Sequence, residues 1–284
     1  MRELKGVPRQ HVYKVIRSGE VRVNSGRAKP KQRLRIGDRV RIPPIRRAET
    51  ATVRAAPNVQ AKLLDHIVFE DDELLVLNKP SGIAVHGGSA ISSGIVEQLR
   101  LAMDNPRLEL VHRLDKETSG CLMLAKKPAA LRALQLEFRE RRVKKIYHLI
   151  VQGIWPKNTY TVSKPLLRYE TSWGERRVKV ASEGQAARTD FQVLQAGAGH
   201  AWLQARLHTG RTHQIRVHAS TSGCPVVGDD KYDRDVKPGV PLLLHASKVH
   251  ISYAGDVLKL AAPIPARFTD YWQIHEPLAA PPEI

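Results

Sequence analysis

The sequence has little cysteine, no long apolar run and a shortage of acidic residues. Two cysteines occur in 284 residues, which excludes a secreted disulfide framework and argues against a multi-cysteine zinc site. The purely apolar runs are only a few residues long, too short to cross a bilayer. The polar opening MRELKGVPRQ has no apolar signal core. We therefore expect a cytoplasmic protein without a membrane segment.

The shortage of acidic residues leaves a large positive charge. Lys and Arg number 46 against 28 Asp and Glu, a net charge of +18, which points to a polyanionic partner, either nucleic acid or an anionic membrane. Residues 1–60 hold 16 Lys or Arg against 4 Asp or Glu, whereas the other 224 residues hold 30 against 24. The length suggests about two domains of ~150 residues each. We expect a basic front domain over 1–46, a linker over 47–61 and a body over 62–284.

The basic front carries ordered patterns, although charge runs are usually solvated tails. Apolar residues at helical spacing precede Ser18-Gly19, which predicts a helix that ends there. Val21 and Val23 alternate with Arg22 as in a half-buried strand, and residues 24–26 read as a turn. Residues 34–42 predict further strand around a turn at Gly37-Asp38. A small folded module is therefore expected rather than a tail.

The body mixes strand and helix patterns. Strands are predicted at 67–70, 74–78, 110–112 and 120–125; helices at 94–102 and 128–142, the second opened by Pro128; and strands or short helices at 146–151, 187–195, 201–207 and 214–218. Many of these strands have no helix between them. The pattern therefore favours an α+β fold with a mixed, largely antiparallel sheet and flanking helices.

The most informative stretch is His112-Arg113-Leu114-Asp115 followed by the turn-prone run KETSG. A loop held between two strands suits a catalytic carboxylate. From composition alone, the commoner explanation is that Asp115 caps a turn or pairs with a surface arginine.

Residues 112–120 resemble the signature of the RluA-type pseudouridine synthases, which isomerise uridine in RNA to pseudouridine. Similar blocks follow that family's order over about residues 66–265: 78–82, 145–147, 209–218, 228–232 and 244–246. Residues 6–43 resemble the S4 RNA-binding domain, through 16–19, 21–24 and 37–40. The family's first helix normally lies upstream, and only a few residues precede Gly6, so either the sequence starts late or the S4-like module is abbreviated.

The resemblance implies a catalytic set. Asp115 is the catalytic aspartate, acting near C1′ or C2′ of the ribose as a nucleophile or as a base; both roles remain open. Tyr147 stacks on the target base and is a candidate to take the C5 proton. Arg216 matches the arginine that pairs with the aspartate, because a buried carboxylate needs a cation.

The same resemblance implies RNA-binding residues. Arg113 fills the space left by the flipped-out uridine, and Arg211 holds a phosphate or supports the loop. Lys145 ends the basic segment and is a candidate to bind RNA phosphates. Arg17 and Arg22 contact RNA from the S4-like module. The basic segment 139–145 follows RNA phosphates or forms a solvated helix face.

Cofactor and partner expectations follow from the reaction. Substrate and product are isomers, and the chain has neither GxGxxG nor GxxxxGK[ST], so we expect no cofactor and no metal. An S4-like front joined to this body implies 23S (large-subunit) rRNA as partner and a monomer. The alternatives are a synthase acting on tRNA and a noncatalytic rRNA-binding or assembly protein.

Overall fold

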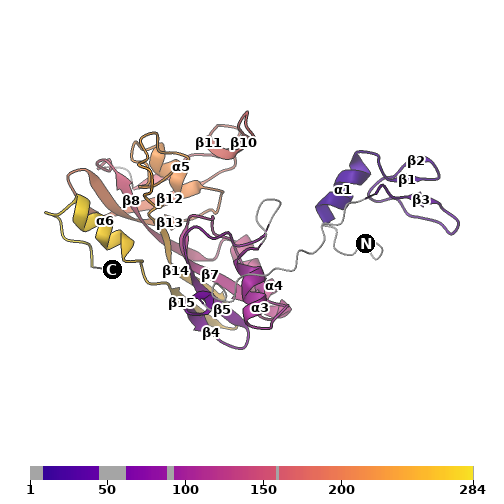
Figure 1. Ribbon diagram of the computed structural model, residues 1–284, viewed down its shortest axis with the longest axis horizontal. Coiled ribbons are helices and arrows are strands. Elements are labelled where there is room, and N and C mark those ends of the chain that lie inside the picture. Colours follow the sequence, from indigo (N-terminus) through magenta and orange to yellow (C-terminus); the bar gives the residue numbers. More distant parts are fainter. Residues whose placement is uncertain (1–8, 45–61, 88–92, 158–159, 284) are drawn as a thin grey trace. The chain divides into compact units, whose positions relative to one another are not determined.

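The chain forms two compact units, Met1–Val53 and Arg54–Ile284, in the computed structural model. The structure describes residues 9–44, 62–87, 93–157 and 160–283 (Figure 1). The expected linker, 47–61, lies outside these residues. None of the helices in the described part of the chain has the length and apolar character needed to span a bilayer.

The N-terminal unit contains one helix and a three-stranded antiparallel sheet. Helix α1 (Arg9–Arg17) precedes β1 (Arg22–Val23), β2 (Gly26–Arg27) and β3 (Val40–Arg41), in the order β2-β1-β3. The expected turn is present, since Asn24 and Ser25 both have positive φ, 48° and 69°. The strand expected at 34–36 is absent. Ile36 is fully exposed there (108%), because this segment has no strand to pair with and no core to pack on.

The larger unit is built on a sheet of ten strands. In chain order they are β4 (Ile67–Glu70), β5 (Leu74–Lys79), β6 (Glu109–Leu110), β7 (Ser119–Ala125), β8 (Lys144–Gln152), β9 (Thr161–Ser163), β12 (Arg188–Ala196), β13 (His200–Leu207), β14 (Leu244–Tyr253) and β15 (Asp256–Ala261). The main path runs β4-β5-β7-β14-β8-β13-β12-β9, with β6 on β7 and β15 on β14. Only the β7–β14 pair in this sheet is parallel. The expected mixed, largely antiparallel α+β fold is therefore confirmed.

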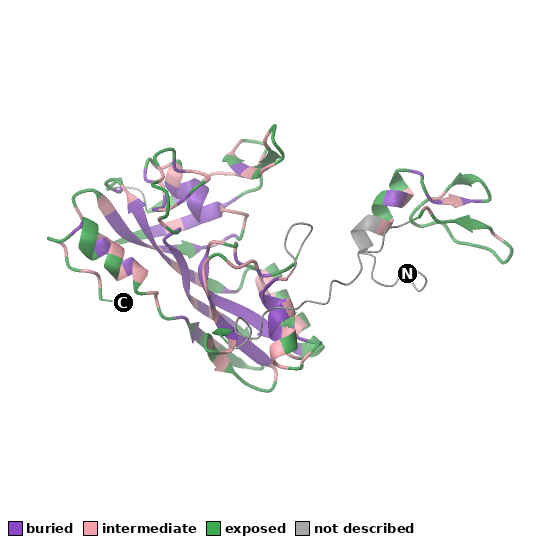
Figure 2. Ribbon diagram, in the orientation of Figure 1, coloured by how far each residue is buried: buried purple, intermediate pink, exposed green. Residues whose placement is uncertain are grey.

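Helices cover both faces of this sheet, whose central strands are buried (Figure 2). Side chains alternate between the faces, so Leu75 and Leu77 of β5 pack with α3 (Ile95–Ala102), while Leu74 and Val76 pack with α4 (Pro128–Arg139). Farther along the sheet, α5 (Gln214–Ser220) packs on the α3 side of β8 and β13. The C-terminal helix α6 (Arg267–His275) packs on the other side, through Phe268 and Trp272.

Some boundaries and elements differ from the sequence prediction. The helix expected over 128–142 ends at Arg139, because Arg141 adopts a left-handed φ of 59°. Residues 214–218, predicted as a strand or a short helix, belong to helix α5. A separate two-stranded hairpin, β10 (Leu166–Glu170) and β11 (Arg176–Val180), was not expected; nor were β14, β15 and α6.

Candidate active site

A cavity of about 810 Å³ opens beside Tyr147, a volume suited to a small organic ligand. Its walls come from the loop 111–118 between β6 and β7, from β8, from the β10–β11 hairpin and from residues 207–216. The lining is rich in cations: Arg113, Lys145, Arg168, Arg176, Arg177, Arg211 and Arg216. Such a lining favours an anionic substrate.

Residues 79–82 hold the loop that carries Asp115 through hydrogen bonds. Lys79 is fully buried, and its ammonium donates 2.8 Å hydrogen bonds to the carbonyls of Pro80, Ile83 and Lys116. The Ser81 hydroxyl donates to the Glu117 carbonyl at 2.6 Å. Burial lowers the pKa of Lys79 to about 7, and the charges of Glu117 and Asp115 act in the opposite direction. These bonds fix the main chain that directly follows Asp115.

A second anchor holds the end of the same loop. The His245 Nε2 lies 3.2 Å from the Ala262 carbonyl, which can only accept, so Nδ1 accepts the Ser119 hydroxyl at 2.9 Å. The Arg267 guanidinium of α6 donates to the same Ser119 oxygen at 2.7 Å. Burial lowers the pKa of His245 to about 4, which keeps the ring neutral and able to accept this bond.

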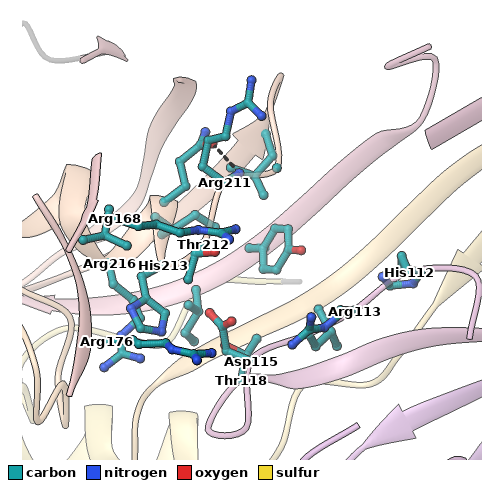
Figure 3. Close-up of a pocket in the computed structure, with 18 of the residues that line it drawn as sticks. His112, Arg113, Asp115, Thr118, Arg168, Arg176, Arg211, Thr212, His213 and Arg216 are labelled. Atoms are coloured by element: carbon teal, nitrogen blue, oxygen red, sulfur yellow. Dashed lines mark hydrogen bonds between the residues drawn. The ribbon is translucent and has the colours of Figure 1, made fainter. Parts of the chain in front are cut away.

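The half-buried Asp115 side chain faces the cavity. Figure 3 shows it between Arg113 on one side and Arg216 on the other. Among the described residues, none donates a hydrogen bond to its carboxylate or forms an ion pair with it. The carboxylate is therefore open to a bound substrate.

Tyr147 lies on β8 between the two clusters of apolar side chains on the cavity side of the sheet. Burial, followed by the negative charge of Asp115, raises the pKa of its hydroxyl. The hydroxyl is therefore a neutral donor near the carboxylate, and its ring is a flat apolar surface in the cavity wall.

Arg216 is buried on α5 (2% exposed) and pairs with a different aspartate from the one expected. Its Nε and a terminal nitrogen donate to the two oxygens of Asp229 at 2.8 and 2.5 Å, and the same nitrogen reaches Asp230 at 3.1 Å. Burial alone would lower the pKa of Arg216, but these bonds and the charges of Asp229 and Asp115 raise it. Asp115 thus acts on Arg216 through its charge, and the described residues contain no direct ion pair between them.

The other expected residues divide between the two units. Arg113 is exposed at the cavity, and Lys145 lines it with a pKa that burial lowers to about 8. Arg211 also lines the cavity, where its Nε donates to the Ala186 carbonyl at 3.2 Å. Arg17 and Arg22 belong to the N-terminal unit, on α1 and β1. Six of the eight expected residues therefore meet in one cavity.

Two residues and one hairpin that shape the cavity were not predicted from the sequence. Lys79 and Asp229 lay in the blocks at 78–82 and 228–232, but nothing in the spacing gave either a role. The available signal for Lys79 was its position at the end of the apolar run LLVLN, since lysine is almost never fully buried without a partner. The β10–β11 hairpin, which brings Arg168 and Arg176 to the cavity, had no clear strand pattern.

His112 lines the cavity and is held in place by its neighbours. Burial lowers the pKa of His112 to about 4; its Nε2 accepts from the Met123 amide at 3.1 Å, and its ring stacks on Phe138. In the part of the chain that the structure describes, no group of three or more His, Cys, Asp or Glu could hold a metal ion.

The fold and this cavity define an enzyme that acts on RNA. Residues 73–221 match the family described as RNA pseudouridylate synthase, and residues 1–40 match the S4 domain. The chain belongs to the RNA pseudouridylate synthase family, which confirms both the resemblance and the isomerase activity expected from it.

Curated relatives and solved structures agree with this assignment. The chain is 45% identical over 276 residues to the ribosomal large subunit pseudouridine synthase C of Salmonella typhi, covering 92% of this chain and 86% of that protein. The protein of the same name from Escherichia coli (strain K12) is 44% identical over the same shares. The structure of human RNA pseudouridylate synthase domain containing 4 has a TM-score of 0.65 at 27% identity, covering 80% of this chain and 98% of that one.

Proposed function

We propose that this pseudouridine synthase modifies uridines of large-subunit (23S) rRNA, with Asp115 as its catalytic residue. The observation that supports this most directly is that the Asp115 carboxylate, without a hydrogen-bond partner among the described residues, faces a cavity lined by seven lysine and arginine side chains. The names of the curated relatives support the choice of rRNA. A flipped-out uridine brings both a phosphate for the cations and a base for the aromatic wall.

Each side chain then has a defined task. Asp115 acts on the ribose of the flipped nucleotide, at C1′ as a nucleophile or at C2′ as a base. The Tyr147 ring supports the uracil, and its neutral hydroxyl donates rather than removes a proton in the resting site. Arg216, fixed by Asp229, supplies positive charge on one side of Asp115. Arg113 enters the stack that the uridine has left.

The N-terminal unit adds RNA affinity in this proposal. Arg22 lies directly opposite both Arg27 and Arg41 in the three-stranded sheet. Like charges on directly opposed residues destabilise a sheet. A polyanion bound across this row of arginines would relieve their repulsion. Arg17, on α1, extends the positive surface of this unit.

The domain limits belong to the same proposal. Residues 1–46 are the RNA-binding module, 47–61 the linker and 62–284 the catalytic domain. We propose a monomer, because one chain supplies all the cavity residues named above, and we place it with its rRNA in the cytoplasm.

The test is tritium release from 23S rRNA transcribed with uridine labelled at C5, because forming pseudouridine expels that hydrogen. Wild type should release tritium and Asp115→Asn should not, while Asp256→Asn, at an exposed position of β15, should retain activity. Steady release by Asp115→Asn would overturn the assigned role of Asp115. Release from tRNA but not from 23S rRNA would overturn the proposed substrate, and tight binding without release from either would indicate a binding protein.

A further inference from the structure

The β10–β11 hairpin presents one tryptophan to solvent beside the cavity. The chain has four tryptophans. Trp155, Trp202 and Trp272 are 5%, 0% and 0% exposed, whereas Trp173 at the hairpin tip is 75% exposed. Exposed tryptophan is enriched at recognition hot spots, so its surroundings decide what it could bind.

The turn that carries Trp173 is held by its own hydrogen bonds. The Thr171 amide donates to the Glu175 carbonyl, and the Gly174 amide donates to the Thr171 carbonyl, both at 2.9 Å. The Glu175 amide donates to the Thr171 hydroxyl at 3.0 Å. Gly174 has a φ of +82°, which glycine adopts without strain. The indole is thus carried by an ordered turn, which reduces the entropy lost on binding.

The hairpin is also fastened to the segment that positions Arg216. The Val178 amide donates to the Tyr232 hydroxyl at 3.0 Å, and the Arg177 guanidinium donates to the Lys231 carbonyl at 2.9 Å. Glu175 forms ion pairs with both Lys231 and Arg177, and these hydrogen bonds lower its pKa to about 2. The hairpin is therefore a fixed wall of the active site. The negative charge of Glu175 is balanced by its two cationic partners.

The remaining cations of the hairpin are available to a ligand. Arg168 and Arg176 are exposed and line the cavity, and neither forms an ion pair with any residue that the structure describes. Lys179 lies 5.6 Å from the centre of the Tyr169 ring. Exposed arginines beside an exposed aromatic ring are the features that bind single-stranded RNA, through phosphates and base stacking respectively.

We propose that the hairpin Leu166–Val180 holds an unpaired segment of RNA next to the flipped-out uridine, with Trp173 stacked on a base and Arg168 and Arg176 on phosphates. This inference rests on the proposed RNA substrate and extends its site beyond the cavity. Every base has a π face, so the contact selects single-stranded over paired RNA rather than one base over another.

Fluorescence tests the stacking without requiring turnover. Because Trp173 is the exposed tryptophan of the four, a ten-nucleotide single-stranded RNA should quench the emission of the wild-type chain. The same strand in a perfect duplex should quench much less. Trp173→Phe should lose this quenching. Equal quenching of wild type and Trp173→Phe, or none of wild type, would overturn the proposal and leave a protein ligand for Trp173 to be considered.

Activity gives the second readout, with tritium-labelled 23S rRNA. Loss of one base–aromatic stack should raise the KM of Trp173→Ala by roughly 5- to 100-fold, with little change in kcat, and Trp173→Phe should recover most of the loss. Tyr160→Ala, which removes another exposed aromatic (67% exposed), is the matched control and should behave as wild type. An unchanged KM in Trp173→Ala would overturn the proposal.

The two proposals fail in different ways. If wild type releases no tritium from 23S rRNA, the proposed substrate is wrong. Quenching by single-stranded RNA that depends on Trp173 would then still support the hairpin contact, and its absence would reject that contact as well.

Discussion

The buried ammonium of Lys79 donates a 2.8 Å hydrogen bond to the main-chain carbonyl of Lys116, the residue that follows Asp115. Its two other bonds go to carbonyls at the end of its own strand, at Pro80 and Ile83. Three acceptors require three N–H groups, which only the charged form of lysine provides. The position of the loop that carries Asp115 therefore depends on one proton held inside the protein.

Replacing Lys79 with methionine should reduce activity without touching the substrate. Lys79→Met removes one donor from each of three carbonyls. The Lys116 carbonyl keeps the Gly82 amide at 2.9 Å, so the cost is about 1–3 kcal/mol for each of the Pro80 and Ile83 carbonyls that stays buried. The loop should then shift, and a shift of about 1 Å can reduce kcat by about 10²-fold. Tritium release and urea unfolding measure the two effects. Lys237→Met, at an exposed position, is the control; wild-type kcat in Lys79→Met would show that the loop holds its position without the ammonium.

The pH dependence of Lys79 has a defined sign. Its pKa is about 7 in the folded chain against an ordinary value of 10.5. Between these values the unfolded chain holds a proton that the folded chain has released, so the free energy of unfolding rises with pH, by about 1.4 kcal/mol per pH unit. The free energy of unfolding of wild type should therefore rise relative to that of Lys79→Met between pH 7 and pH 10. A constant difference would contradict the lowered pKa.

Replacing each of the two aspartates that pair with Arg216 by asparagine should have very different effects on stability and activity. The Asp229 side chain is 0% exposed and that of Asp230 is 68% exposed. Asp229→Asn removes the partner of a buried cation, which costs about 3–5 kcal/mol, and frees Arg216 to move within the cavity, so kcat should fall as well. Asp230→Asn should change stability by less than about 1 kcal/mol. Equal effects in denaturant unfolding and tritium release would contradict the assignment of Asp229 as the positioning partner.

Local elements were predictable where residue patterns decide them. The strand over 67–70 was predicted with the bounds of β4, and the helix beginning at Pro128 differed only at its C-terminal end. The gathering of Asp115, Tyr147 and Arg216 could be expected only from the resemblance, because no pattern within the chain relates residues so far apart.

The contacts that hold the site could not be predicted in this way. Arg216 was expected to pair with Asp115. Its guanidinium instead binds Asp229, because α5 and the turn that follows it bring these two residues together. The bond from Arg267 to Ser119 joins residues 148 positions apart, and only the packing of α6 on the sheet creates it. Residues 34–36 alternate like a strand, but pairing requires a neighbour that sequence alternation cannot supply.

Gly120 should tolerate no side chain. It has a φ of +111°, and a Cβ there would overlap the backbone of Ala246, where β7 and β14 run parallel. Gly120→Ala should therefore strongly destabilise the sheet beside the loop that carries Asp115. Gly255 has a similar φ of +92° with open space around it, so Gly255→Ala measures the conformational cost alone, about 1–2 kcal/mol. Similar losses in thermal unfolding of the two variants would show that β14 moves aside.

Two buried histidines should make the fold sensitive to acid. Burial lowers the pKa of His148 and His245 to about 4 from 6.5. Between these values the unfolded chain binds protons that the folded chain does not, so stability falls as pH falls, by about 1.4 kcal/mol per pH unit for each ring. His148→Gln should reduce the slope of unfolding free energy against pH between 4.5 and 6. An unchanged slope would show that His148 is charged in the folded chain.

The row of arginines in the N-terminal unit should make RNA affinity depend on salt concentration. If Arg22, Arg27 and Arg41 neutralise phosphates, each replacement by glutamine should weaken RNA binding and reduce the slope of log affinity against log salt by about 0.7–0.9. Arg22→Gln and Arg41→Gln should leave the unit as stable or more stable, because fewer like charges then face each other across the sheet. Arg27→Gln also loses the hydrogen bond from Arg27 to the Ser18 carbonyl. Arg107→Gln, at an exposed position of the larger unit, is the control for loss of one positive charge. A salt slope that stays the same in Arg22→Gln and Arg41→Gln would place the RNA elsewhere on the chain, whereas a slope that falls with each replacement would count the phosphates bound along β2, β1 and β3.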